Sequence, residues 1–129
     1  MKILESNYNN GHSTITIQTA SGIFTGNANL HPEDKDVESR IVGWEIAEQR
    51  AIINYYKDKI KKEKNIIKGI KEVYLINGES IYIDDLIYQH KNQIKSWEKQ
   101  IQESKEILKE IFDGINKTKM VIKRKNKTE

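Results

Sequence analysis

The sequence predicts an α+β fold in which an N-terminal antiparallel β-meander packs on two long α-helices. Three observations support this prediction. Residues 14–19 (TITIQT) alternate with the period of two that is typical of a strand. Apolar residues recur at helical spacing from Val37 onward, and they recur every seven residues from Ile87 to Ile115. With 129 residues in total, we assign the chain to one domain, residues 1–129.

Composition narrows the classes of function. Cysteine is absent, which excludes disulfides, thiolate metal sites and a cysteine nucleophile. Hydrophobic residues make up 36% of the chain and charged residues 32%, so the core is small and self-association is expected to complete it. No apolar run approaches the roughly 20 residues that cross a membrane, and the N-terminus lacks the apolar block of a signal peptide. We therefore expect an intracellular protein with no membrane partner.

The β-meander is placed in residues 1–31, and glycine and asparagine provide its turns. The expected strands are Lys2–Glu5, Thr14–Thr19 and Ile23–Leu30, joined by turns at Asn7–Gly11 and Ala20–Gly22. Gly26 lies inside the third strand, where a glycine indicates a bulge or the close approach of another backbone. One face of this sheet is apolar and must be covered by a helix.

The first long helix is placed in residues 36–71. His31-Pro32 ends the preceding strand, and Asp34 and Asp36 are the candidate N-caps. Two apolar stripes on this helix predict that it is wedged between the sheet and another element. Gly69 is expected to lie at its fraying end.

One face of the first helix combines small residues with arginines. Arg40, Gly43, Ala47 and Arg50 follow one another at three- and four-residue spacing. The small residues allow another backbone or a ligand to approach closely. Because lysine is the usual basic residue in this chain, the few arginines are candidates for bidentate contacts.

Three further elements are expected. Asn77-Gly78 predicts a short β-hairpin, or an irregular connector, over residues 73–83. A second helix over residues 84–114 is capped by Asp84-Asp85 and ended by Gly114, and its seven-residue apolar repeat predicts pairing with another helix. Residues 118–129 are expected to form a short strand, Met120–Ile122, and a basic tail.

No constellation of residues indicates catalysis. No serine or threonine lies in a nucleophile elbow, and no carboxylate pair lies in an apolar setting. His31, Asp34 and Asp36 are best explained as a strand end and helix caps, while His12 and His90 have no companion ligands in the sequence. We therefore expect no enzymatic activity, no metal and no cofactor.

The first half of the chain resembles a known family. The resemblance is carried by the NYNNG turn, the segment TGNANLHPEDKD and a helical motif made of Ser39, Gly43, Ile46, Ala47, Glu48, Arg50 and Ala51. These residues are similar to those of the first family of Thoeris anti-defence proteins. That family consists of phage proteins, called sponges, that sequester the immune signal glyco-cyclic ADP-ribose.

The resemblance implies a binding protein without turnover that acts in the cytoplasm of the infected bacterium. It implies a homodimer, with dimers able to assemble into hexamers, and pockets near the dimer interface. Some members of the family also bind the cyclic di- or trinucleotide signals of CBASS. In this chain, the ligand-binding candidates are Arg40, Arg50 and Arg124 for the diphosphate, Tyr74 and Tyr82 for stacking on adenine, and Asn92 for polar readout.

Two other interpretations remain open at this point. Lysines dominate residues 57–71 and 117–127, which also suits a small nucleic-acid-binding or regulatory protein of a phage. The lysines of 57–71 alternate with glutamates, however, which is more typical of a solvated helix face. A helical structural adaptor, whose function is its seven-residue repeat, is the third interpretation.

Overall fold

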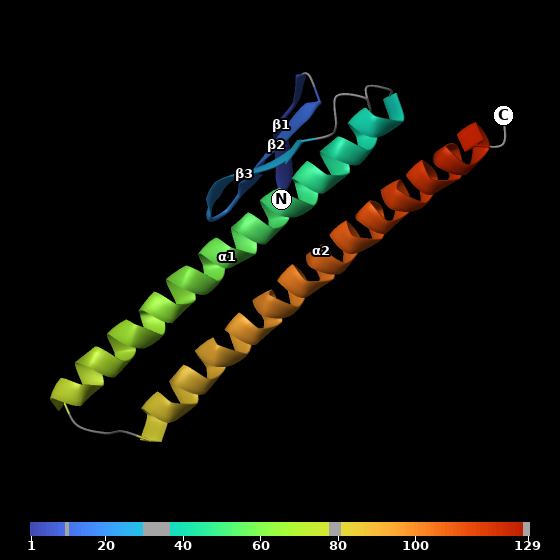
Figure 1. Ribbon diagram of the computed structural model, residues 1–129. Coiled ribbons are helices and arrows are strands. Elements are labelled where there is room, and N and C mark those ends of the chain that lie inside the picture. The colour runs from blue at the N-terminus through green and yellow to red at the C-terminus, as the bar shows by residue number, and fades with distance from the viewer. Residues whose placement is uncertain (10, 30–36, 78–80, 128–129) are drawn as a thin grey trace.

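The computed structural model confirms the α+β fold. It describes residues 1–9, 11–29, 37–77 and 81–127, and the side chains of 1–9, 11–29, 41–73 and 83–115. The elements are β1 (Lys2–Asn9), β2 (His12–Thr19), β3 (Gly22–Asn29), α1 (Val37–Asn77) and α2 (Ile81–Lys127). They form three layers, because the sheet packs on one side of α1 and α2 runs antiparallel to α1 on the other (Figure 1).

The sheet is the expected meander with strand order β1-β2-β3, and both pairs are antiparallel. β1 extends to Asn9, so it is longer than the predicted Lys2–Glu5. The turn after it contains Gly11, which has a φ of 84° and thus a conformation that favours glycine. The register of β1 on β2 shifts between Ile3 and Glu5, so the bulge of this sheet lies in β1 and not at Gly26.

Gly26 is instead the point of closest approach between the sheet and α1. A Cβ atom on Gly26 would lie 1.9 Å from the carbonyl oxygen of Ala47 and 2.4 Å from the nitrogen of Ala51. Both alanines are fully buried. The small-residue face of the first helix therefore serves to admit a strand backbone, which confirms one of the two outcomes predicted for Gly26.

The core between the sheet and α1 is built from isoleucine and alanine side chains and one tyrosine. Its buried members are Ile15, Ile17, Ala28, Ile46, Ala47, Ala51 and Tyr55. Leu108, Ile111 and Ile115 of α2 pack against this cluster from the opposite side. The sheet-proximal half of α1 is thus covered on two sides, as its two apolar stripes predict.

The two helices pair along a seam with seven-residue spacing. Buried isoleucines come from both helices: Ile53, Ile60 and Ile67 of α1, and Ile94 and Ile101 of α2. Ile87, Trp97 and Leu108 pack against them. The repeat that was expected to pair with another helix is therefore satisfied within the chain, by α1.

One layer of the seam is polar. Nδ1 of His90 and a carboxylate oxygen of Glu63 form a hydrogen bond between the two helices. The side chains of His90 and Glu63 are only 24% and 14% exposed. A polar pair at a seam position favours one register of the two helices, because a shifted register leaves both groups buried without partners.

Replacing His90 with leucine is expected to lower the free energy of unfolding by about 1–3 kcal/mol, because the Glu63 carboxylate then lacks its partner. The double variant Glu63→Leu/His90→Leu is expected to recover most of that loss, since a leucine pair suits the seam. Urea unfolding of the two variants and the wild type measures both effects. Equal stability of the two variants would contradict the coupling between these residues.

The structure corrects the prediction for residues 73–83. The described residues of this segment are helical and form no hairpin, because α1 continues through Val73 to Asn77 and α2 begins at Ile81. Gly78 lies outside the described residues. The β-branched and aromatic residues of 73–83 have a local preference for strands. The apolar repeat of the seam continues through Ile70 and Ile83, however, and packing of each helix against the other outweighs the strand preference.

The predicted helix ends are also wrong. Gly69 and Gly114 lie inside α1 and α2, and Asp84 lies in the first turn of α2 rather than before it. The strand predicted at Met120–Ile122 is helical, as α2 continues to Lys127. Ile122 follows Ile115 at seven-residue spacing, so the same repeat extends through this segment. The candidate caps Asp34 and Asp36 lie outside the described residues.

The far half of the helix pair projects beyond the sheet (Figure 1). Before this projecting part begins, Lys62 of α1 contacts the turn between β2 and β3, where its ammonium group lies 3.4 Å from the carbonyl oxygen of Ser21. The same ammonium group lies 2.9 Å from a carboxylate oxygen of Asp58. We call this projecting part, residues 63–77 of α1 and 81–98 of α2, the arm. None of the described helices is long and apolar enough to span a membrane.

Candidate functional site

The predicted ligand-binding residues fall at opposite ends of the helix pair. Arg40 and Arg50 lie in the sheet-proximal part of α1, whereas Tyr74 lies near the other end of α1 and Tyr82 is the second residue of α2. The 24 residues from Arg50 to Tyr74 correspond to about 36 Å along the helix. A single small nucleotide bound to one chain therefore cannot contact both groups.

Four of the six predicted residues have side chains outside the described part. These are Arg40, Tyr74, Tyr82 and Arg124, whose backbones lie in α1 or α2. Their roles remain predictions. Asn92 is described: it lies on α2 with an exposed side chain, away from the seam.

Arg50 has a structural partner. Its Nη1 donates a hydrogen bond of 2.7 Å to the carbonyl oxygen of Asn27 in β3. One turn further along α1, Nδ2 of Asn54 donates a hydrogen bond of 2.9 Å to the carbonyl oxygen of Thr25. Arg50 thus acts together with Asn54 to tie α1 to β3, and this contact explains its position without a ligand.

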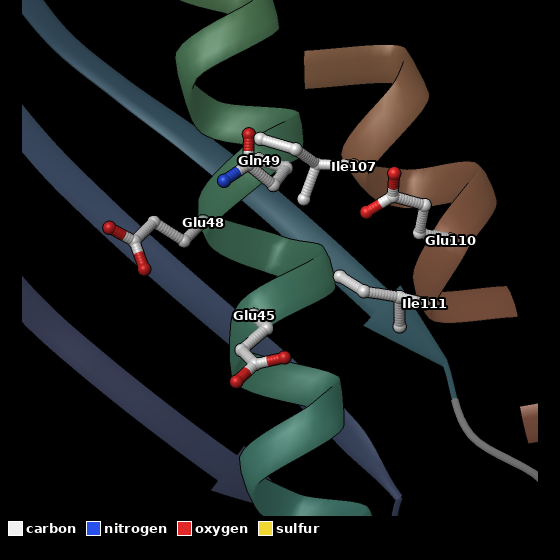
Figure 2. Close-up of a pocket in the computed structure, with 6 residues that line it drawn as sticks. All are labelled: Glu45, Glu48, Gln49, Ile107, Glu110 and Ile111. Atoms are coloured by element: carbon white, nitrogen blue, oxygen red, sulfur yellow. The ribbon is translucent and has the colours of Figure 1, made fainter. Parts of the chain in front are cut away.

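In the described part of the helix pair, one groove between α1 and α2 lies near the sheet and is acidic. It has a volume of about 300 Å³ and is lined by Glu45, Glu48, Gln49, Ile107, Glu110 and Ile111. Figure 2 shows that Glu48 extends away from α2, whereas Glu110 lies on the side of α2 that faces α1. Three carboxylates around this groove repel a phosphate-bearing ligand.

The second groove lies in the arm and is basic. It has a volume of about 330 Å³ and is lined by Lys64, Ile67, Lys91, Ile94, Lys95 and Glu98. Ile67 and Ile94 belong to the buried seam, so they provide an apolar floor. Three ammonium groups surround this floor, with one carboxylate. The combination of an apolar floor and several cations suits an organic anion with an apolar ring.

The position of the three lysines follows from the seam. Lys64, Lys91 and Lys95 each come directly after a seam residue, namely Glu63, His90 and Ile94. Lys64 belongs to α1 and the other two belong to α2, so the groove is closed from both helices. The sequence prediction missed this site, because it treated residues 57–71 as a solvated face and did not place Lys64 opposite Lys91.

The groove lysines differ from their neighbours in what they contact. Lys59 lies 4.9 Å from the centroid of the Tyr55 ring and 5.2 Å from that of Trp97, and Lys62 pairs with Asp58. Among the described side chains, Lys64, Lys91 and Lys95 have neither an ion pair nor a ring contact. Their ammonium groups are therefore not held in an ion pair and can bind an anion.

Other kinds of site find less support. Among the described side chains, no group of three or more His, Cys, Asp or Glu residues is arranged to hold a metal ion. His12, one of the histidines considered above, forms a hydrogen bond with Asn29 on the outer face of the sheet. Comparison with protein-family models, curated proteins and solved structures gives no match.

Proposed function

We propose that this chain is a phage immune-evasion protein that binds a cyclic ADP-ribose-type nucleotide, glyco-cyclic ADP-ribose in particular, and sequesters it without cleaving it. In this role it blocks Thoeris defence in the cytoplasm of the infected bacterium. The proposal extends to the cyclic di- and trinucleotides of CBASS, and to a homodimer that assembles into a hexamer. It draws on the resemblance of the segments within residues 7–51 described above.

The observation that carries the proposal is the basic groove of the arm. A diphosphate has two negative charges, and Lys64, Lys91 and Lys95 provide three positive charges around one opening. The apolar floor made by Ile67 and Ile94 accommodates the face of a base or a ribose. Tight binding without turnover requires these contacts but no general acid or base near the phosphates.

Calorimetry with glyco-cyclic ADP-ribose tests the proposal. We expect micromolar or tighter binding by the wild type, and release of the intact nucleotide when the loaded protein is heat-denatured. The double variant Lys91→Glu/Lys95→Glu is expected to bind about a hundredfold more weakly or worse, because two charged contacts become repulsive. Arg50→Ala, which affects β3 rather than the groove, is expected to bind like the wild type.

Lys57→Glu/Lys61→Glu is the matched control. These two lysines are exposed on α1, have the same four-residue spacing and give the same change in net charge, but they lie outside the groove. Equal losses of affinity in the two double variants would refute a local site. A chemically altered nucleotide after release would indicate an enzyme, and salt-sensitive binding to long DNA or RNA alone would favour the nucleic-acid interpretation.

A further inference from the structure

The lysine-rich stretch of α1, residues 57–71, is less neutralised than its sequence indicates. It contains two acidic residues, Asp58 and Glu63. A carboxylate oxygen of Asp58 lies 2.9 Å from the ammonium group of Lys62, and Glu63 forms its hydrogen bond with His90 in the seam. Both carboxylates are therefore engaged elsewhere, and the other lysines of this stretch keep their charge unopposed.

Four of those lysines form an exposed row along one face of α1. Their spacing of four, three and four residues places them above one another on the helix. Among the described side chains, none of the four has an ion pair or a ring contact. The 11 residues from the first to the last correspond to about 17 Å along the helix axis. This lysine row consists of Lys57, Lys61, Lys64 and Lys68.

Helix α2 adds two lysines on the same side of the helix pair. Lys91 and Lys95 lie one turn apart on α2, and both line the basic groove together with Lys64 of the lysine row. Glu98 is the one carboxylate among the residues that line this groove. Because the groove joins the row to the α2 pair, all six lysines form one surface, which we call the basic face.

A small nucleotide in the groove leaves much of the basic face unused, since Lys57 and Lys61 lie outside the groove. The length of the lysine row equals about five base pairs of a duplex, at about 3.4 Å for each pair. Lysine ammonium groups are point charges that contact phosphates whatever the base sequence. Proteins that bind single strands add aromatic side chains for base stacking, and neither the row nor the groove lining contains one.

We propose that the basic face binds the phosphate backbone of a DNA duplex without regard to its sequence, as a second activity that does not depend on nucleotide binding. Two rows of cations from two helices suit a polyanion that extends along the helix pair. Recognition of an RNA duplex adds contacts to the 2′-hydroxyl groups. A row of ammonium groups, which only donate hydrogen bonds, has no acceptor for these hydroxyl groups.

Fluorescence anisotropy with a labelled DNA duplex of about 20 base pairs and mixed sequence tests this proposal. With six lysines at phosphates, the logarithm of the association constant is expected to fall against the logarithm of the salt concentration with a slope of about −5. Lys57→Gln/Lys61→Gln is expected to reduce this slope by about two and to weaken binding about tenfold or more. The same variant is expected to bind glyco-cyclic ADP-ribose like the wild type, because neither lysine lines the groove.

Gln93→Glu/Gln100→Glu is the matched control, because it lowers the net charge by the same amount at two exposed positions. Gln93 and Gln100 precede Ile107 of the acidic groove at seven-residue spacing, so they lie on the face of α2 away from the lysines. The control is expected to keep its DNA affinity within about twofold, since salt of about 0.1 M screens charges beyond about 10 Å.

Circular dichroism verifies that each variant is folded. A wild type that does not bind the duplex at about 50 mM salt, where phosphate contacts are strongest, overturns the proposal. Equal losses of DNA affinity in the two double variants also overturn it, because net charge and not the basic face would then explain the binding. Tighter binding of an RNA duplex or a single strand of the same length would contradict the assignment to duplex DNA.

Discussion

Gly26→Ala is expected to lower the free energy of unfolding by about 3 kcal/mol or more, at the upper end of the effects of overpacking. The new Cβ would lie 1.9 Å and 2.4 Å from backbone atoms of Ala47 and Ala51, and backbone atoms of a helix cannot rotate away as a side chain can. The sheet must move off α1, which loosens the core around Ile15 and Ile17. Urea unfolding followed by circular dichroism measures the loss.

Gly69→Ala is the matched control for that substitution. Gly69 lies inside α1, and a Cβ there has nothing within 4 Å. Alanine is a better helix former than glycine, so Gly69→Ala is expected to raise stability by about 0.5–1 kcal/mol. If both alanine variants changed stability in the same direction, the close approach at Gly26 would not be the cause.

Ile60→Ala is expected to destabilise the protein by about 2–4 kcal/mol, because it leaves a cavity in the seam between the helices. Ile60 is 9% exposed and belongs to the isoleucine cluster shared by α1 and α2. Thermal or urea unfolding measures the effect. The variant tests whether the pairing of the helices, beyond the core under the sheet, contributes to global stability.

Ile66→Ala is the same substitution on the same helix at a site that is 47% exposed. Its effect is expected to be within about 0.5 kcal/mol, since little apolar surface is lost and alanine favours the helix. A large loss at Ile66 together with a small loss at Ile60 would mean that the helices pair in a different register from the one described.

The elements of the fold were predictable where the signal was local. The alternation of Ile15 and Ile17 with threonines indicated β2, and the seven-residue repeat through Ile94 and Ile101 indicated α2. The ends of the helices were not predictable from such signals. Gly69 and Gly114 are local breakers worth about 1 kcal/mol each, and the seam between the helices, which only the tertiary structure defines, outweighs them.

The site was less predictable than the fold. Arg50 was a candidate for binding an anion, and the sequence did not show that its guanidinium also donates a hydrogen bond to a carbonyl oxygen of β3, more than twenty residues away in sequence. In a chain rich in lysine, nothing in the sequence distinguishes the lysines of the basic groove from the other lysines. Lys64 and Lys91 become neighbours only through the antiparallel register of α1 and α2, which the residue pair Glu63 and His90 helps to fix.

The length of the helix pair affects how the size of this protein in solution must be measured. The 47 residues of α2 extend over about 70 Å. A compact domain of 129 residues has a radius of gyration of about 14 Å and is therefore only about 36 Å across. The frictional drag on such a rod is larger than that on a sphere of equal mass. A single 15.1 kDa copy will therefore elute from a gel-filtration column at the volume of a heavier globular standard. Elution volume alone would thus report a false dimer, and scattered-light mass distinguishes the two.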